Sequence, residues 1–150
     1  MKAGKVRAIA ICVFQNGNRI LVAEGYDRVK KQVFYRPLGG TIEFGEPAAI
    51  TVQREIQEEL ELVTVGIKYL GTLENIFSYE GQAGHEIILV FDGEFQDSSV
   101  YKMKILIGYE GDGAKITALW KDLEEFTPGN HRAGPPLYPT CLLELLREQK

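Results

Sequence analysis

The stretch that decides the fold is residues 36–62, which read RPLGGTIEFGEPAAITVQREIQEELEL. Pro47 suits the first turn of a helix, and we expect that helix to run to about Leu60. One stripe of this helix is apolar at helical spacing, and it consists of Ala49, Val52, Ile56 and Leu60. The segment therefore predicts a glycine-bearing loop followed by an amphipathic helix that packs one face against a core.

Three carboxylates lie on the helical face beside this apolar stripe. Glu55, Glu58 and Glu59 are spaced i, i+3 and i+4, so their side chains are neighbours and repel one another by a few tenths of a kcal/mol per pair. A divalent cation among them would remove that cost, and hard carboxylate oxygens suit Mg²⁺ or Mn²⁺. Taken alone, the three glutamates favour a solvated helix face over a metal–phosphate site.

The same stretch resembles the Nudix box, G-x₅-E-x₇-R-E-U-x-E-E-x-G-U, where U is a bulky aliphatic residue. The matching positions are Gly40, Glu46, Arg54-Glu55, Ile56, Glu58-Glu59 and Leu62. Glu61 is the one departure, because it stands where the motif has its second glycine. A glycine just after a helix usually takes a left-handed conformation, which other residues adopt at a cost of about 1 kcal/mol. We therefore expect a different helix exit or local strain at Glu61.

The order of predicted elements indicates an α/β fold with a mixed sheet between helices. We expect extended strands over residues 5–14, 19–25, 33–36, 63–79, 85–95 and 115–120. We expect loops at 38–45 and at 97–114, the latter with some strand, and helices at 121–126 and 139–148. The resemblance implies the same architecture over a single domain, residues 1–150. It is an α/β/α sandwich with a central mixed sheet, the box helix (box 40–62) on one side and the C-terminal helix on the other.

The resemblance also implies roles for the residues of the box. In Nudix enzymes the box holds divalent cations, Mg²⁺ or Mn²⁺, against a diphosphate. Carried over, the expected metal ligands are the Gly40 carbonyl and the side chains of Glu55, Glu58 and Glu59. Glu55 is otherwise the residue that orients the attacking water, and Arg54 positions the box carboxylates by ion pairing. Glu46 is expected to hold the loop to the helix.

Outside the box, several residues are candidates for the site on weaker grounds. Some Nudix enzymes take a further base or ligand from another segment, and Glu86 and Glu110 are candidates for it here. Glu43 lies three residues before Glu46 and could line the site, while Arg36 could contact phosphate. A solvated acid or a surface arginine is the alternative at each position.

The box predicts the chemistry but leaves the substrate open. Tyr79 lies 17 residues after Leu62, and a tyrosine near that position resembles the dinucleoside polyphosphate hydrolases of the family, so Tyr79 is a candidate substrate contact. Stacking on a base is possible for Phe34, Phe77, Tyr79 and Tyr138, but core packing is the expectation for each. We also expect Trp120 in the core and His85 as a structural, hydrogen-bonding histidine.

The resemblance implies a divalent-metal-dependent hydrolase that cleaves a P–O–P bond in a nucleoside diphosphate derivative. The derivative is a nucleoside triphosphate, a dinucleoside polyphosphate or a nucleotide sugar. The alternative is a catalytically silent Nudix-fold module that binds a nucleotide; the presence of all three box glutamates argues against it. A structural domain with an incidental acidic helix is a third reading.

Composition excludes several other classes. The chain has 150 residues and a net charge of −4, which argues against broad binding of nucleic acid or an anionic membrane. Residues 41–62 carry six glutamates against one arginine, a charge of −5, so the rest of the chain carries +1. Cys12 and Cys141 are expected to be reduced, packed thiols, consistent with a cytoplasmic protein. The longest apolar run is too short to span a bilayer, and a homodimer is compatible with the family.

Overall fold

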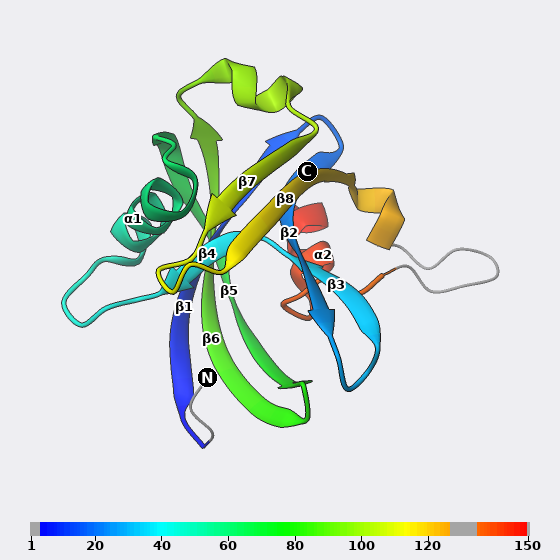
Figure 1. The fold of residues 1–150 in the computed structure, drawn as a ribbon. Coiled ribbons are helices and arrows are strands. Elements are labelled where there is room, and N and C mark those ends of the chain that lie inside the picture. Colours follow the sequence, from blue (N-terminus) through cyan, green and yellow to red (C-terminus); the bar gives the residue numbers. More distant parts are fainter. Residues whose placement is uncertain (1–3, 127–134, 150) are drawn as a thin grey trace.

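The computed structural model describes residues 4–126 and 135–149, which fold around one twisted sheet (Figure 1). The strands are β1 (Val6–Asn16), β2 (Arg19–Asp27), β3 (Gln32–Arg36), β4 (Leu38–Thr41), β5 (Thr64–Tyr79), β6 (Gln82–Phe95), β7 (Ile105–Tyr109) and β8 (Lys115–Asp122). The helices are α1 (Ala48–Leu60), α2 (Leu142–Glu148) and the 3₁₀ helices η1 (Ser98–Lys102) and η2 (Leu123–Phe126).

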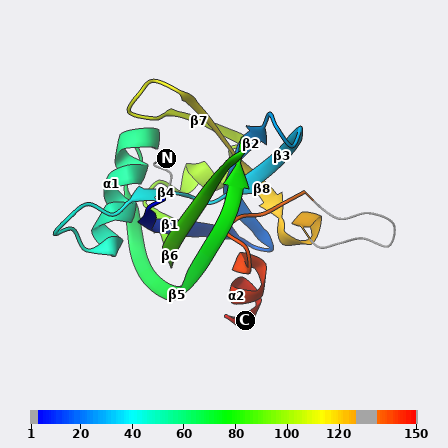
Figure 2. The same ribbon diagram turned by 90° about the horizontal axis from the view of Figure 1, so that it is seen from below.

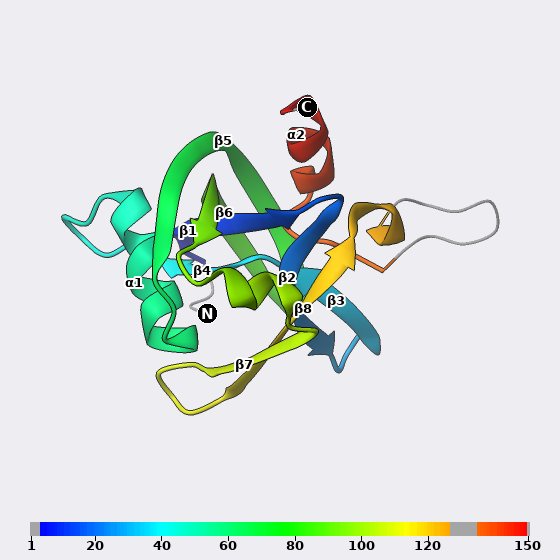
Figure 3. The ribbon, with the colours of Figure 1, turned by 90° about the horizontal axis from the view of Figure 1, so that it is seen from above.

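Strand β1 lies at the centre of the sheet and is buried on both faces. Its side chains alternate between the faces, as in any strand. Ala10, Cys12 and Phe14 pack with Val52 and Ile56 of α1. On the other face, a second cluster joins β1 to α2, and its members include Ile9, Ile11, Val13, Leu142 and Leu146. The two helices therefore cover opposite faces of the strands (Figures 2 and 3), which gives the expected α/β/α layers.

The sheet is mixed, with the strand order β5-β6-β1-β2-β8-β7. Strands β1 and β6 are parallel, whereas the other pairs are antiparallel. Only Gln15 and Asn16, at the end of β1, pair with β2. Earlier in β1, residues 9–12 pair with β4 instead. Strand β4 thus lies beside β1 where β2 has diverged, and it delivers the start of the box to the centre of the sheet.

Several predicted elements differ from the observed ones. Residues 38–41 form strand β4 and not a loop, because the glycines allow a close approach to β1: a Cβ on Gly39 would meet the carbonyl oxygen of Ala10 and lie 2.7 Å from the Cα of Ile11. Residues 97–114, expected as loop with some strand, contain both η1 and β7. The expected helices at 121–126 and 139–148 are shorter, since η2 begins at Leu123 and α2 at Leu142.

The cysteines and Trp120 lie partly as expected. Trp120 is buried in the cluster beneath α1. Cys12 is fully buried, and burial raises the pKa of its thiol. Both cysteines are free, but Cys141 is exposed, so the prediction that it is packed was wrong. Within residues 4–126 and 135–149, the structure contains no helix that is both long and apolar enough to cross a membrane.

Candidate active site

The loop before α1 is fastened to the helix through Glu46. The Nε and Nη2 atoms of Arg54 donate to the two carboxylate oxygens of Glu46 at 2.7 and 2.9 Å. Thr51 adds a hydrogen bond of 2.6 Å from its hydroxyl. These bonds, above all those from Arg54, lower the pKa of Glu46 to about 2. The paired charges fix the entry of the loop into the helix.

Arg54 also contacts the acidic face of the helix. Its Nη1 lies 2.9 Å from Oε1 of Glu55 and 3.4 Å from Oε2 of Glu58. Its Nη2 donates to the backbone oxygen of Thr41 at 3.3 Å, which ties α1 to β4. The carboxylates around Arg54 raise the pKa of its guanidinium, with Glu46 the main cause. One cation thus orients three of the four glutamates that match the motif.

The side chain of Glu55 and the backbone of Glu59 each lie against a glycine. A Cβ on Gly40 would lie 2.6 Å from Oε1 and 2.7 Å from Cγ of Glu55, so only glycine leaves room for this carboxylate. On the other side, β7 packs on the end of α1, and a Cβ on Gly108 would meet the backbone of Glu59. Burial, followed by hydrogen bonding and repulsion from Glu55, raises the pKa of Glu59 well above its ordinary range.

A cleft of about 660 Å³ opens beside this helix face. It brings together most of the residues that the sequence nominated, namely Arg36, Gly40, Glu43, Glu55, Glu58, Glu59, Glu86 and Glu110. Arg36 lies 4.0 Å from Glu110, which comes from the loop after β7. The floor is apolar and includes Ile9, Ile11 and Ile88. The acidic end and the apolar floor together suit a ligand with one charged and one uncharged part.

A row of polar side chains crosses the sheet at the edge of the cleft. Asn75, Glu86 and Arg7 face one another on the neighbouring strands β5, β6 and β1, and all three line the cleft. Arg7 lies 3.5 Å from Glu86 and donates to the hydroxyl of Thr41 at 2.7 Å. Arg7 and Asn75 were not nominated from the sequence. Their positions depend on the register of strands distant in the chain, and no local pattern indicates it.

Comparison with known proteins identifies the family. Residues 4–140 match the NUDIX domain. The chain belongs to the Nudix family. Membership indicates a hydrolase that acts on pyrophosphate bonds. The matched residues cover most of the chain. No curated protein matches this Nudix chain.

Solved structures share the Nudix fold at low sequence identity. A NUDIX hydrolase from Nitrosomonas europaea is 14% identical, with a TM-score of 0.62 over 97% of this chain and 88% of the other. A MutT NUDIX hydrolase from Burkholderia pseudomallei is 19% identical, with a TM-score of 0.58 over 97% and 99%. The ORF135 protein of E. coli is 20% identical, with a TM-score of 0.56 over 96% and 90%. These likenesses confirm the α/β/α fold.

Nudix proteins typically use a divalent metal, and the donor set here fits one. The cleft is lined by six carboxylates and two arginines among the described residues, and carboxylate oxygens are the ligands that Mg²⁺ and Mn²⁺ prefer. Within those residues, no three acidic, histidine or cysteine side chains converge closely enough to hold a metal ion. Arg54 forms ion pairs with Glu55 and Glu58. The assignment of ligands in this Nudix box therefore stays a prediction.

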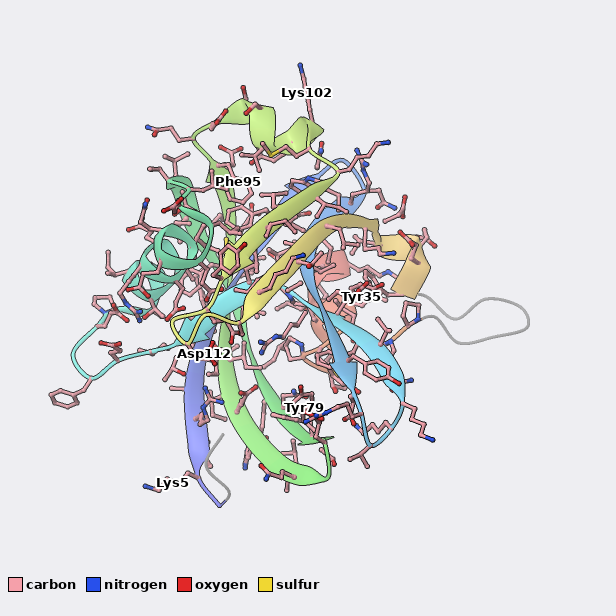
Figure 4. All side chains as sticks on the ribbon, in the orientation of Figure 1. Lys5, Tyr35, Tyr79, Phe95, Lys102 and Asp112 are labelled. Carbon is pink, nitrogen blue, oxygen red and sulfur yellow. The ribbon has the colours of Figure 1, made fainter. Side chains whose placement is uncertain are left out.

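Three of the four aromatic residues nominated from the sequence, Phe34, Tyr79 and Tyr138, lie in one cluster beside the Nudix cleft. Phe34 makes edge contacts with Tyr79 and Tyr138, at centroid distances of 5.8 and 5.7 Å. Tyr138 lines the cleft, whereas Tyr79 does not do so in the part of the chain that the structure describes. Figure 4 shows Tyr79 near the end of β5. Tyr79 is partly exposed, so the prediction that it packs in the core was wrong. His85 is on the opposite face of β6 from Glu86, and its Nε2 forms a hydrogen bond of 2.8 Å with Glu74, as expected of a structural histidine.

Proposed function

We propose that this Nudix domain is a divalent-metal-dependent hydrolase that cleaves a P–O–P bond in a nucleoside diphosphate derivative. The observation that carries the proposal is the acidic face of α1 at one end of the cleft. Glu55, Glu58 and Glu59 line the cleft together with Gly40. A structural helix has no need to direct three like charges into a hollow.

The charge of the cleft argues for a cation. Six carboxylates face two guanidinium groups there, so a diphosphate would meet net repulsion. When bound, a divalent metal neutralises phosphate oxygens, lowers the pKa of a bound water and stabilises the leaving phosphate. The Gly40 carbonyl and the carboxylates of Glu55, Glu58 and Glu59 would hold it. Mg²⁺ is the first choice and Mn²⁺ the second.

The remaining residues bind and orient the substrate in this proposal. Arg54 keeps the box carboxylates in place through its ion pairs with Glu46 and Glu55. Arg36 lies at the rim and contacts a phosphate oxygen, and Glu43 lines the same end. Glu86 is the candidate base outside the box; in this position it would accept a proton from the attacking water. Tyr79 would reach only a substrate that extends beyond the cleft.

The test is a screen of nucleoside triphosphates, dinucleoside polyphosphates and nucleotide sugars with Mg²⁺ or Mn²⁺, with released phosphate or pyrophosphate measured. We expect turnover of at least one class, and Glu58→Gln is expected to remove nearly all of it while the protein stays folded. Glu61→Gln is the matched control, because it makes the same change three residues on in an exposed side chain at the end of α1.

Equal loss in the two variants would show that the effect is not specific to the acidic face. Full activity of Glu58→Gln would contradict the metal site. The base is tested separately by Glu86→Gln, for which we expect a lower kcat with an altered pH profile. An unchanged kcat across the pH range would exclude Glu86 as the base.

A further inference from the structure

Asn75 is a buried polar residue with an unused hydrogen-bonding group in the cleft. Asn75 is 4% exposed. It lines the cleft, and it lies opposite Glu86 of β6 on the same face of the sheet. The neighbouring residues Glu74 and Ile76 point to the opposite face, since side chains alternate along a strand. A buried amide normally satisfies its donors and acceptors.

The orientation of the Asn75 amide is fixed by one hydrogen bond. The backbone N–H of Thr140 donates to Oδ1 of Asn75 at 3.3 Å. A backbone nitrogen can only donate, so the oxygen must face Thr140 and the NH₂ group must face the other way. Within residues 4–126 and 135–149, this NH₂ group has no protein partner. Asn75 thus presents the two donors of its NH₂ group to a ligand.

Apolar and aromatic side chains suited to a flat ligand lie close to Asn75, beside the ion pair of Glu86 and Arg7. Tyr138 and Pro139 line the cleft next to Thr140, and Ile88 lies on the neighbouring strand β6. Apart from its cross-strand neighbour Glu86, Asn75 is well separated from the carboxylates of the box. Strand β5 is three strand spacings from β4, which carries Gly40, and that is about 14 Å across the sheet. One ligand can therefore place phosphates at Gly40 and a base at Asn75.

We propose that the Asn75 amide donates a hydrogen bond to a keto oxygen of the nucleobase, so that the cleft selects guanine and uracil over adenine and cytosine. The keto bases present an acceptor oxygen where adenine and cytosine present an amino donor. An amino group would face the NH₂ of Asn75 donor to donor and leave both unpaired, and an unpaired buried donor is costly. This inference rests on the proposed function, because it names the base of the same substrate.

The test measures base preference without turnover. Binding of the uncharged nucleosides guanosine, uridine, adenosine and cytidine is measured by titration calorimetry in EDTA, with wild-type protein and with Asn75→Asp. The variant keeps the size of the side chain and the acceptor for Thr140 but loses both donors. We expect the wild type to bind guanosine and uridine about tenfold more tightly than adenosine and cytidine, and the variant to lose that preference.

Gln82→Glu is the control, since it makes the same amide-to-acid change at an exposed site on β6. It should leave all four affinities unchanged. Equal weakening of all four nucleosides in Asn75→Asp would overturn the inference, because a general disturbance of the cleft does that. An absence of base preference in the wild type, or of binding at millimolar concentration, would overturn it too. If the preference is found but no P–O–P bond is cleaved in the screen, only the proposed function fails.

Discussion

Alanine substitution of the two adjacent glycines in β4 should have different effects: Gly40→Ala should lower activity, and Gly39→Ala should lower stability. A Cβ on Gly40 would meet the end of the Glu55 side chain, with Oε1 at 2.6 Å. The Cδ of Glu55 would be closer still, and ordinary contact begins at 3.4 Å, so the carboxylate would have to retreat by about 1 Å. A side-chain end can move by that distance cheaply. Gly40→Ala should therefore fold with a free energy of unfolding within about 1 kcal/mol of the wild type.

The same movement should be costly for activity. A displacement of about 1 Å in a catalytic group can reduce a rate about 100-fold. We expect kcat/KM of Gly40→Ala to fall by about that factor against the best substrate of the screen. Turnover is measured by product release, and folding by circular dichroism and thermal melting of the same samples.

Gly39→Ala supplies the contrast. Its Cβ would meet backbone atoms of Ala10 and Ile11, which cannot retreat without separating β4 from β1. We expect a loss of about 3 kcal/mol, or a Tm lower by about 6–12 °C. If Gly40→Ala keeps full activity while folded, the placement of Glu55 against Gly40 does not matter for catalysis. If Gly40→Ala melts as early as Gly39→Ala, the side chain of Glu55 is not free to move.

Three further outcomes are expected. The Glu46 carboxylate, whose pKa falls from 4.5 to about 2 on folding, contributes stability that is full above pH 4.5 and is lost as the pH falls toward 2. The difference between wild type and Glu46→Gln in urea midpoints should therefore shrink over that range; a constant difference would contradict the ion pair with Arg54. Glu61 has a left-handed backbone conformation, with φ 58°. Glu61→Gly should therefore raise the Tm by about 2–4 °C, corresponding to about 1 kcal/mol. A lower Tm would show that no strain is stored at Glu61. Mg²⁺ at ten times its Kd should stabilise the protein by about 1.4 kcal/mol, which raises the Tm by about 3–6 °C. If Mg²⁺ produces no rise in Tm that EDTA reverses, the result argues against a metal site.

Much of the fold and the acidic helix could be predicted from the sequence. The apolar stripe of Val52 and Ile56 predicted which face of α1 is buried, and both side chains are fully buried. The departure at Glu61 predicted strain or a new helix exit, and the residue is in fact left-handed. Such features are local, because spacing along one helix decides them.

Other features depend on strands that meet only in three dimensions. Arg7 and Glu86 are 79 residues apart and contact each other through the parallel pairing of β1 with β6. Asn75 meets Thr140 across 65 residues. Strand β4 was mistaken for a loop because glycine usually marks one; here Gly39 is required by the close approach to β1. Periodicity and turn signals carry no information on such registers.

The central claim is that metal-dependent attack by water on a P–O–P bond takes place in this cleft. The most direct measurement follows a nucleoside triphosphate, a dinucleoside polyphosphate and a nucleotide sugar by ³¹P NMR, with wild-type protein in Mg²⁺ and again in EDTA. The account predicts that the anhydride phosphorus signals of at least one compound are replaced by phosphomonoester or inorganic phosphate signals in Mg²⁺ and persist in EDTA. Persistence of every anhydride signal in both Mg²⁺ and Mn²⁺, or cleavage that EDTA leaves unchanged, would contradict it.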